Sequence, residues 1–298
     1  NRSETVANTL WDSSRGITKF LVSEQTAAEY TNASGYELTS FNTDGFGLGA
    51  HNNAGINQSS SYNYVAWQWK ANGGTTTSVS ESSYNAGGTY QKNETAGFSI
   101  VSYTGIDTVG EVTHGLTTQP QVVIVKRRND TGNWATYHES AGITGTLFLN
   151  TTAAKGNTTA YFHTGWGSAT KFPIGSNADT NADGATYVAY VFSERQGYSK
   201  FGGYIGNGSA EGPFVYTGFK PAWVMTKRTD GTSGWFIQDI KRGIRNSSSG
   251  TALEANSNLA ESGIGATNYD IDFLSNGFKL RQSNVYLNAS GGTYIYMA

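Results

Sequence analysis

The sequence predicts an all-β protein built from tandem antiparallel β-sandwich repeats of the jelly-roll or lectin-like type. Three observations lead to this prediction. The composition is poor in charge and rich in glycine, the chain repeats itself with a period of about a hundred residues, and apolar residues alternate between turns of Gly, Asn, Asp and Ser. Alternation with period two is the signature of strands, and these turn residues reach positive φ at low cost.

The composition excludes several other classes of protein. Of the 298 residues, 14% are charged and 38 are glycine, which does not suit long solvated helices. The aromatic content of 13% supplies apolar area to bury, so the chain is not disordered. A net charge of −2 gives no electrostatic footprint for nucleic acid, and no stretch is long and apolar enough to span a membrane. The absence of cysteine excludes disulfides and thiol chemistry.

Two complete repeats are predicted at residues 97–196 and 197–298. In both, a proline precedes a strand that ends in Lys-Arg, and a tryptophan follows after a Gly-containing turn. The spacing from proline to lysine is six residues in both copies, and from lysine to tryptophan it is eight in both. The aligned anchors are Pro120, Lys126 and Trp134 in one copy and Pro221, Lys227 and Trp235 in the other.

The strands of the complete repeats differ in how they should be buried. The run 122–125 is continuously apolar, which is typical of a strand in the middle of a sandwich. The Tyr-rich segment 186–192 is apolar at both odd and even positions, so we expect an inner strand covered on both faces. Short helices are expected at residues 151–155 and 256–262.

Residues 1–71 form a third copy that lacks its front half. The segment 11–16 matches 238–243, and Tyr64–Trp69 takes the place of the Tyr-rich strand. A repeat without these strands exposes sheet edges, so we expect an upstream segment or a neighbouring subunit to complete it. Residues 72–96 are rich in Gly, Ser and Thr and are predicted as a flexible linker or an extra hairpin.

The sequence predicts no catalytic residue. His138 has Asp12 and Asp239 as its counterparts in the other copies, which indicates a surface position rather than a catalytic base. Asp270 and Asp272 share the spacing of paired carboxylates on one strand, but no third acid follows, and an ordinary exposed strand is the better interpretation. No G-x-S-x-G motif indicates a serine nucleophile. The protein is therefore predicted not to be an enzyme.

One loop carries the start of a calcium-binding pattern. Asp179, Asn181 and Asp183 place oxygen ligands at alternate residues ahead of Gly184. The bidentate glutamate that such a loop needs is replaced by Tyr190. A plain hairpin loop is therefore the first interpretation and calcium the alternative, and no other cofactor is expected.

Two further groups of residues are candidate contact sites. Basic residues end a strand beside a tryptophan in both complete repeats, where they could shield an edge, stack on the indole or pair across a subunit boundary. These candidate interface residues are Lys126, Arg127, Arg128, Trp134, Lys227, Arg228 and Trp235. Tyr161, His163 and Trp166 lie in a Gly/Thr-rich loop and are candidate sugar-stacking residues, although core or interface packing is the alternative for most aromatics.

Several segments resemble a known repeat family. They are Gly97–Gly105, His114–Leu116, Val123–Arg128, Gly212–Val224 and Phe273–Leu280. Together they are similar to repeats common in tail-fibre-like virion structural proteins of marine tailed bacteriophages, and the resemblance covers essentially the whole chain. The family supplies no catalytic residue to carry over.

The resemblance implies a non-catalytic virion structural protein, in a tail fibre or a decoration, that presents a β-rich surface for host attachment and glycan binding. It implies a virion or extracellular location and assembly as a homo-oligomer, either a trimer or a filament, with other virion proteins and a host surface glycan as partners. The alternatives are a secreted lectin-like or glycoside-hydrolase-like carbohydrate-binding protein and a subunit of another extracellular filament.

Overall fold

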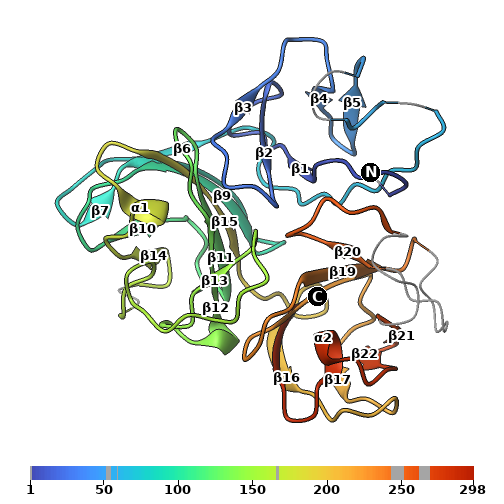
Figure 1. The fold of residues 1–298 in the computed structure, drawn as a ribbon. Helices are drawn as coiled ribbons and strands as arrows, with labels where there is room; N and C mark the ends of the chain where they lie inside the picture. Colours follow the sequence, from blue (N-terminus) through green and yellow to red (C-terminus); the bar gives the residue numbers. More distant parts are fainter. Residues whose placement is uncertain (1, 52–54, 59, 166–167, 243–251, 262–268) are drawn as a thin grey trace.

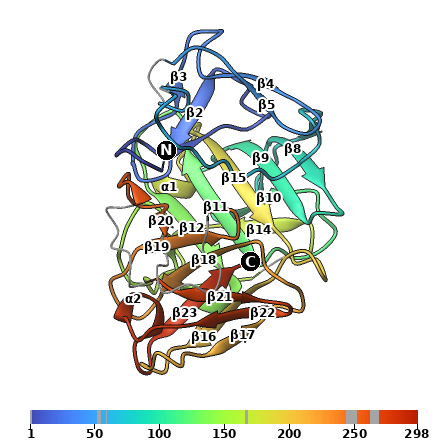
Figure 2. The ribbon, with the colours of Figure 1, turned by 90° about the vertical axis from the view of Figure 1, so that its right-hand side faces the viewer.

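The protein is made of three lobes that meet at a common centre (Figure 1). The computed structural model describes residues 2–51, 55–58, 60–165, 168–242, 252–261 and 269–298. The repeats at residues 2–71, 97–196 and 197–298 form the first, second and third lobes, and an insert of residues 72–96 adds its strands to the sheets of the second lobe. Viewed at 90°, the first lobe lies above the second and the third lies below it (Figure 2).

The second lobe is a sandwich of a large and a small sheet. The large sheet has the order β13-β12-β11-β15-β9-β8-β6, and the small sheet has the order β14-β10-β7. The strands are β6 (Thr77–Val79), β7 (Asn85–Ala86), β8 (Gly88–Asn93), β9 (Phe98–Thr104), β10 (Gly110–Thr113), β11 (Val122–Arg127), β12 (Trp134–His138), β13 (Leu147–Phe148), β14 (Lys171–Ile174) and β15 (Thr186–Phe192).

The third lobe repeats this plan without the insert. Its sheets have the orders β16-β23-β18-β19-β20 and β17-β22-β21. The strands are β16 (Phe201–Ile205), β17 (Phe214–Tyr216), β18 (Trp223–Arg228), β19 (Trp235–Asp239), β20 (Leu253–Glu254), β21 (Ile271–Leu274), β22 (Gly277–Leu280) and β23 (Thr293–Met297). The order β16-β23-β18-β19-β20 corresponds strand by strand to β9-β15-β11-β12-β13, and the predicted all-β fold of tandem antiparallel sandwiches is confirmed.

The first lobe has only short strands. One sheet joins β1 (Thr9–Leu10), β2 (Lys19–Val22) and β3 (Tyr30–Thr31), and a separate pair joins β4 (Leu38–Phe41) and β5 (Phe46–Leu48). Residues 64–69 belong to no strand. The helical elements, all short, are η1 (Glu139–Ala141), α1 (Ala178–Asn181) and α2 (Val285–Asn288). In the described ranges no helix is long and apolar enough to cross a bilayer.

The inner strand β15 is buried on both faces, as the pattern of residues 186–192 predicted. Tyr187, Ala189 and Val191 pack inside the sandwich of the second lobe. Val188, Tyr190 and Phe192 face a central core that the lobes share. Leu21 of the first lobe and Met225 of the third belong to the same core. The second and third lobes therefore have their own sandwich interiors, and the three lobes also enclose one common interior.

The helices expected at residues 151–155 and 256–262 are wrong for the part that the structure describes. Residues 151–155 and 257–260 carry no helix there, while Asn256 lies in a turn and Glu261 in a 3-10 position. Lys155 donates its backbone N–H to the carbonyl of Thr229 at 2.9 Å, so the chain runs along a neighbouring lobe instead of bonding within itself. Local propensity is overridden by this pairing.

Some glycines are required because the backbone of another segment passes close to them. A Cβ on Gly105 would collide with the carbonyl oxygen of Ala182, and one on Gly206 would collide with that of Ala289. The two positions correspond in the second and third lobes. Part of the high glycine content therefore follows from close backbone approaches that recur in the repeats.

Candidate functional site

Many of the ionisable and hydrogen-bonding side chains singled out in the sequence lie at the junctions between lobes. Trp134 donates its indole N–H to the carbonyl of Val22 at 3.0 Å, which joins the second lobe to the first. Trp235 donates to the carbonyl of Phe148 at 2.9 Å, which joins the third lobe to the second in the same way. Both indoles are buried. The predicted interface tryptophans thus lie at boundaries between lobes of one chain.

The third junction closes the ring with a different side chain. Asn8 stands at the position of the tryptophans and donates its amide N–H to the carbonyl of Glu254 at 3.0 Å. A backbone bond also recurs at every junction, with lengths of 2.8, 2.9 and 2.9 Å. These bonds are Glu29 N–H to Arg128 O, Lys155 N–H to Thr229 O and Glu261 N–H to Arg2 O. The lobes are therefore related by one repeated mode of contact.

The buried lysines of the predicted interface set serve two of these junctions. Lys126 donates to the carbonyl of Thr26 at 3.2 Å, and Lys227 donates to that of Thr152 at 3.3 Å. Burial lowers the pKa of both ammonium groups to about 8. These lysines do not shield a sheet edge, because they are covered by the neighbouring lobe.

The arginines of the same set are more exposed. Arg128 pairs with Glu29 across the first–second junction at 2.9 Å. Arg127 and Arg228 make local pairs with Asp130 and Asp230 at 3.5 and 2.8 Å. Among the contacts of the described residues, Arg128 is the arginine of this set that joins two lobes through its side chain.

A buried Asp–Arg–Glu cluster occurs twice. In the first lobe, Asp12 contacts Arg15 at 2.5 Å, and Arg15 contacts Glu29 at 3.3 Å. In the third lobe, Asp239 contacts Arg242 at 2.6 Å, and Arg242 contacts Glu261 at 3.0 Å; the arginine and aspartate side chains of both clusters are almost fully buried.

Electrostatics favour the charged form of these clusters. Burial alone would raise the pKa of Asp239, but the hydrogen bond and positive charge of Arg242 outweigh it, so the pKa lies below its ordinary value. For Arg15, burial would lower the pKa, while Tyr190, Asp12 and Glu29 together raise it. A buried ion pair of this kind fixes the relative position of its side chains, because separating them leaves an uncompensated buried charge.

His138 occupies the aspartate position in the second lobe, and its predicted surface location is wrong. It is 1% exposed, because the third lobe covers this position. Its Nδ1 accepts the N–H of Ser140 at 3.2 Å, so the neutral ring carries its proton on Nε2, which donates to the carbonyl of Tyr296 at 3.1 Å. Burial lowers the pKa of His138 to about 4. The histidine is a neutral junction residue.

The calcium pattern has structural partners in this fold. Asp179 accepts hydrogen bonds from Asn133, and the amide of Asn181 bonds Ile106 N–H and the carbonyls of Thr108 and Gly175. Asp183 is exposed. Within the described ranges, no group of three or more His, Asp or Glu residues is placed to hold a metal ion. Calcium binding at this loop stays a prediction.

The candidate sugar-stacking residues are only partly described. Tyr161 packs edge-on against Phe148 at a centroid distance of 5.2 Å and contacts the core of the second lobe. His163 is half-buried, and its Nδ1 has no hydrogen-bond partner among the described residues. Trp166 lies outside the described residues. Their role in sugar binding stays a prediction.

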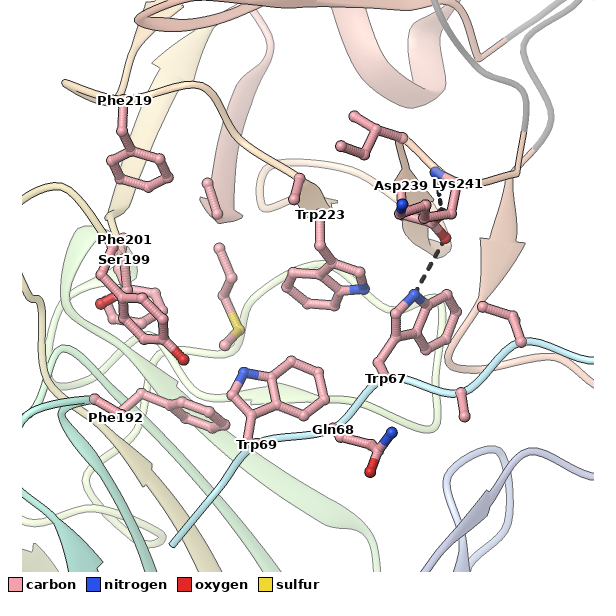
Figure 3. A pocket seen from close by; sticks show the side chains of 18 residues that line it. Trp67, Gln68, Trp69, Phe192, Ser199, Phe201, Phe219, Trp223, Asp239 and Lys241 are labelled. Carbon is pink, nitrogen blue, oxygen red and sulfur yellow. Dashed lines mark hydrogen bonds between the residues drawn. The ribbon is translucent and has the colours of Figure 1, made fainter. Parts of the chain in front are cut away.

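An aromatic pocket lies where the first and third lobes meet, beside the end of β15 (Figure 3). Its volume is about 420 Å³. Trp69 packs edge-on against Trp223 at 5.4 Å and against Phe192 at 6.2 Å. Trp67 donates to Asp239 at 3.1 Å, the contact drawn as a dashed line in Figure 3. Of these indoles, Trp69 is exposed, at 39%.

Fold and junctions define a class: a tandem β-sandwich protein whose lobes are joined by recurring buried contacts. The chain belongs to the family described as a domain of unknown function (DUF7483), whose model matches residues 1–298. No curated protein and no solved structure matches the chain.

Sequence reasoning missed the buried clusters and the pocket. A signal for the clusters was present, because Asp-x-x-Arg-Gly recurs at 12–16 and 239–243 with a glutamate further along in both copies. The pocket has no comparable signal, since its walls come from segments far apart in the chain.

Proposed function

We propose that this protein is a non-catalytic structural component of a virion, in a tail fibre or a decoration, that presents a β-rich surface for host attachment. The observation that carries the proposal is that side chains capable of acid–base chemistry are buried at the junctions between lobes. His138, Lys126 and Lys227 are buried and bonded to backbone carbonyls of other lobes. Fully bonded buried polar groups fix one arrangement of packed parts, which suits a rigid building block.

The surface of the third lobe supports a role in assembly. In the part of the chain that the structure describes, the edge strands β16 and β17 have one unpaired edge each, whereas β8 and β7 of the insert cover the equivalent edges of the second lobe. Ile205 and Tyr216 on these edges are 66% and 64% exposed, and Phe214 is exposed beside them. Apolar side chains on open strand edges are typical of surfaces that pair with other chains. Copies of this protein or other virion proteins are the proposed partners.

Host attachment through glycans is the second part of the proposal. The low surface charge and the exposed aromatic side chains suit contact with uncharged sugars. The loop with Tyr161 and His163 is the proposed contact, and His163→Ala is the cleaner test because Tyr161 also packs on the core. Loss of a glycan-array signal in this variant, with an unchanged unfolding midpoint, would support that assignment.

The structural proposal is tested by locating the protein. Immunogold labelling of purified phage particles is expected to mark a tail appendage or the capsid surface. In parallel, the isolated protein should release no reducing sugar from a polysaccharide panel. Detection of the protein only in a secreted, particle-free fraction with glycan binding would favour the lectin-like alternative, and turnover that is lost in Asp272→Asn would contradict the non-catalytic role.

A further inference from the structure

Residues 64–69 occupy the place of an inner sheet strand. Their sequence Tyr-Val-Ala-Trp-Gln-Trp parallels Tyr187–Phe192 of β15, Tyr-Val-Ala-Tyr-Val-Phe. The contacts correspond too, because Trp67 donates to Asp239 and Tyr190 donates to Asp12, the equivalent aspartate of another lobe. The segment therefore lies against the third lobe as β15 lies against the first.

The two segments differ in their neighbours. β15 is hydrogen-bonded to β11 along one edge and to β9 along the other. The backbone of residues 65–69 forms no hydrogen bond with any residue that the structure describes. An inner strand with bare edges presents a row of donors and acceptors to another strand.

The pocket lies where the other two junctions place a strand beside the segment that corresponds to residues 64–69. At the first–second junction, the turn after Asp12 is covered by the β9 side of the large sheet, where Gln91 of β8 bonds Ser13 and Ser14. At the second–third junction, η1 packs on β16, the counterpart of β9. At the third–first junction, the equivalent residues Ile240 and Lys241 line the pocket instead.

We propose that this pocket is a strand-binding slot, in which an extended segment of another protein chain pairs antiparallel with residues 64–69 as β9 pairs with β15. The argument is continuity with the other junctions, where a strand of the same sheet fills the equivalent place. Addition of a strand to a bare edge is an established mode of peptide recognition, with backbone bonds giving affinity and alternate side chains giving specificity.

The fold also indicates the chemistry of the bound segment. In β9, Phe98 and Ile100 face the central core, paired with Phe192 and Tyr190 of β15. The corresponding partners in the slot are Trp69 and Trp67, so the bound strand should carry bulky apolar residues at alternate positions and no charge between them. This partner deepens the proposed structural role and rests on it.

The polar groups of the pocket favour a backbone partner over a sugar. The carboxylate of Asp239 already accepts bonds from Trp67, Lys241 and Arg242. The indole N–H of Trp223 is buried and has no partner among the described residues. The open strand edge of residues 65–69 is therefore the largest supply of unused hydrogen-bonding groups, and a strand satisfies such an edge.

The test uses the β9 sequence itself as the probe. A synthetic peptide of residues 97–105, labelled with a fluorophore, is titrated with the whole protein and followed by anisotropy. Bonds at the ends of the pair, Ser193 N–H to Gly97 O and Gly105 N–H to Ala185 O, place the odd-numbered residues of β9 in bonding register with β15. N-methylation at Ser99 and Val101 should therefore weaken binding by at least about tenfold, whereas N-methylation at Ile100 and Ser102 should not.

A matched pair of protein variants probes the same edge. By the same register, Ala66→Pro removes an N–H that faces the slot, and Val65→Pro removes one that faces the opposite edge. We expect the first variant to weaken the peptide by at least about tenfold and the second to leave it unchanged, at equal unfolding midpoints.

Three results would overturn the proposal of a strand-binding slot. The first is no binding of the peptide at millimolar concentration, and the second is equal binding of both N-methylated peptides. The third is quenching of Trp69 emission by neutral oligosaccharides but not by the peptide. These measurements use the isolated protein, so they do not depend on where the assembly occurs. Failure of the structural proposal would appear in the labelling of particles instead.

Discussion

The indole N–H of Trp67 donates a hydrogen bond of 3.1 Å to the carboxylate of Asp239, which joins the first lobe to the third. The guanidinium of Arg242 lies 5.5 Å from the centre of the same ring. Tyr190 makes the equivalent contact with Asp12 between the second lobe and the first. A segment without strand partners is thus held in place by a contact that a regular sheet strand makes elsewhere.

Replacing Trp67 by phenylalanine should test this contact. The change keeps an aromatic ring beside Arg242 but removes the N–H donor to an ionised acceptor, so we expect a loss of about 1–3 kcal/mol in the free energy of unfolding. Urea denaturation measures it. Trp69→Phe is the matched control, since no hydrogen bond from the Trp69 indole occurs in the described part of the chain. Equal losses in the two variants would show that the hydrogen bond is unimportant.

Breaking a buried Asp–Arg pair should cost more. Asp239→Asn leaves the buried guanidinium of Arg242 without its closest counter-charge, and we expect a loss of about 3–5 kcal/mol. Asp272→Asn removes the partner of Arg281 in a more exposed pair at 3.2 Å and should cost at most about 1 kcal/mol. Denaturation curves of the two variants, recorded at pH 7 in the same buffer, provide the comparison. A loss at Asp239 no greater than at Asp272 would contradict the role assigned to the cluster.

The stability of the protein should fall in mild acid because of buried neutral histidines. Burial lowers the pKa of His138 and of His114 to about 4, from an ordinary value of 6.5. Between these values the unfolded chain takes up protons that the folded chain does not bind, so stability is lost as the pH falls from 6.5 towards 4. A shift of this size corresponds to about 3 kcal/mol for one histidine.

His138→Asn isolates one of these contributions. The asparagine oxygen can still accept the N–H of Ser140 but does not titrate, while the bond to the carbonyl of Tyr296 is lost. We expect lower stability at pH 7 and a shallower decline between pH 6.5 and 4 than in the parent protein. Unfolding midpoints measured across this range would contradict the assignment if the slope stayed the same.

Sequence comparison was most successful where local pattern and global fold agree. The double alternation of residues 186–192 predicted an inner strand with two covered faces, and the aligned repeats predicted equivalent sandwiches. It fails at His138, because variation between copies predicts a surface position and the side chain is buried. The residue type at that position can change because the junction needs only a side chain that hydrogen-bonds the following turn and the neighbouring lobe. Asp12 does this with its carboxylate oxygens and His138 with its ring nitrogens.

The pocket could not be predicted, for a related reason. Among the described residues, a strand present at two junctions has no counterpart at the third, and the walls of the pocket there include Trp69, Phe192 and Trp223 from three lobes. Alternation within one segment shows which face of a strand is apolar but not which lobe covers that face. The aromatic residues chosen from the sequence, Tyr161 and His163, lie elsewhere in the second lobe.

The two junction tryptophans should contribute independently. Trp134→Phe and Trp235→Phe each remove an indole donor from a buried carbonyl, so each should cost about 1–3 kcal/mol. Trp134 should cost more, because its N–H also lies 3.1 Å from the carbonyl of Gln25, whereas among the described residues the Trp235 indole donates to Phe148 alone. The bonds share no partner, so the double variant should show the sum of the single losses within about 0.5 kcal/mol. A combined loss well below that sum, measured by urea denaturation, would instead mean that opening one junction already releases the other.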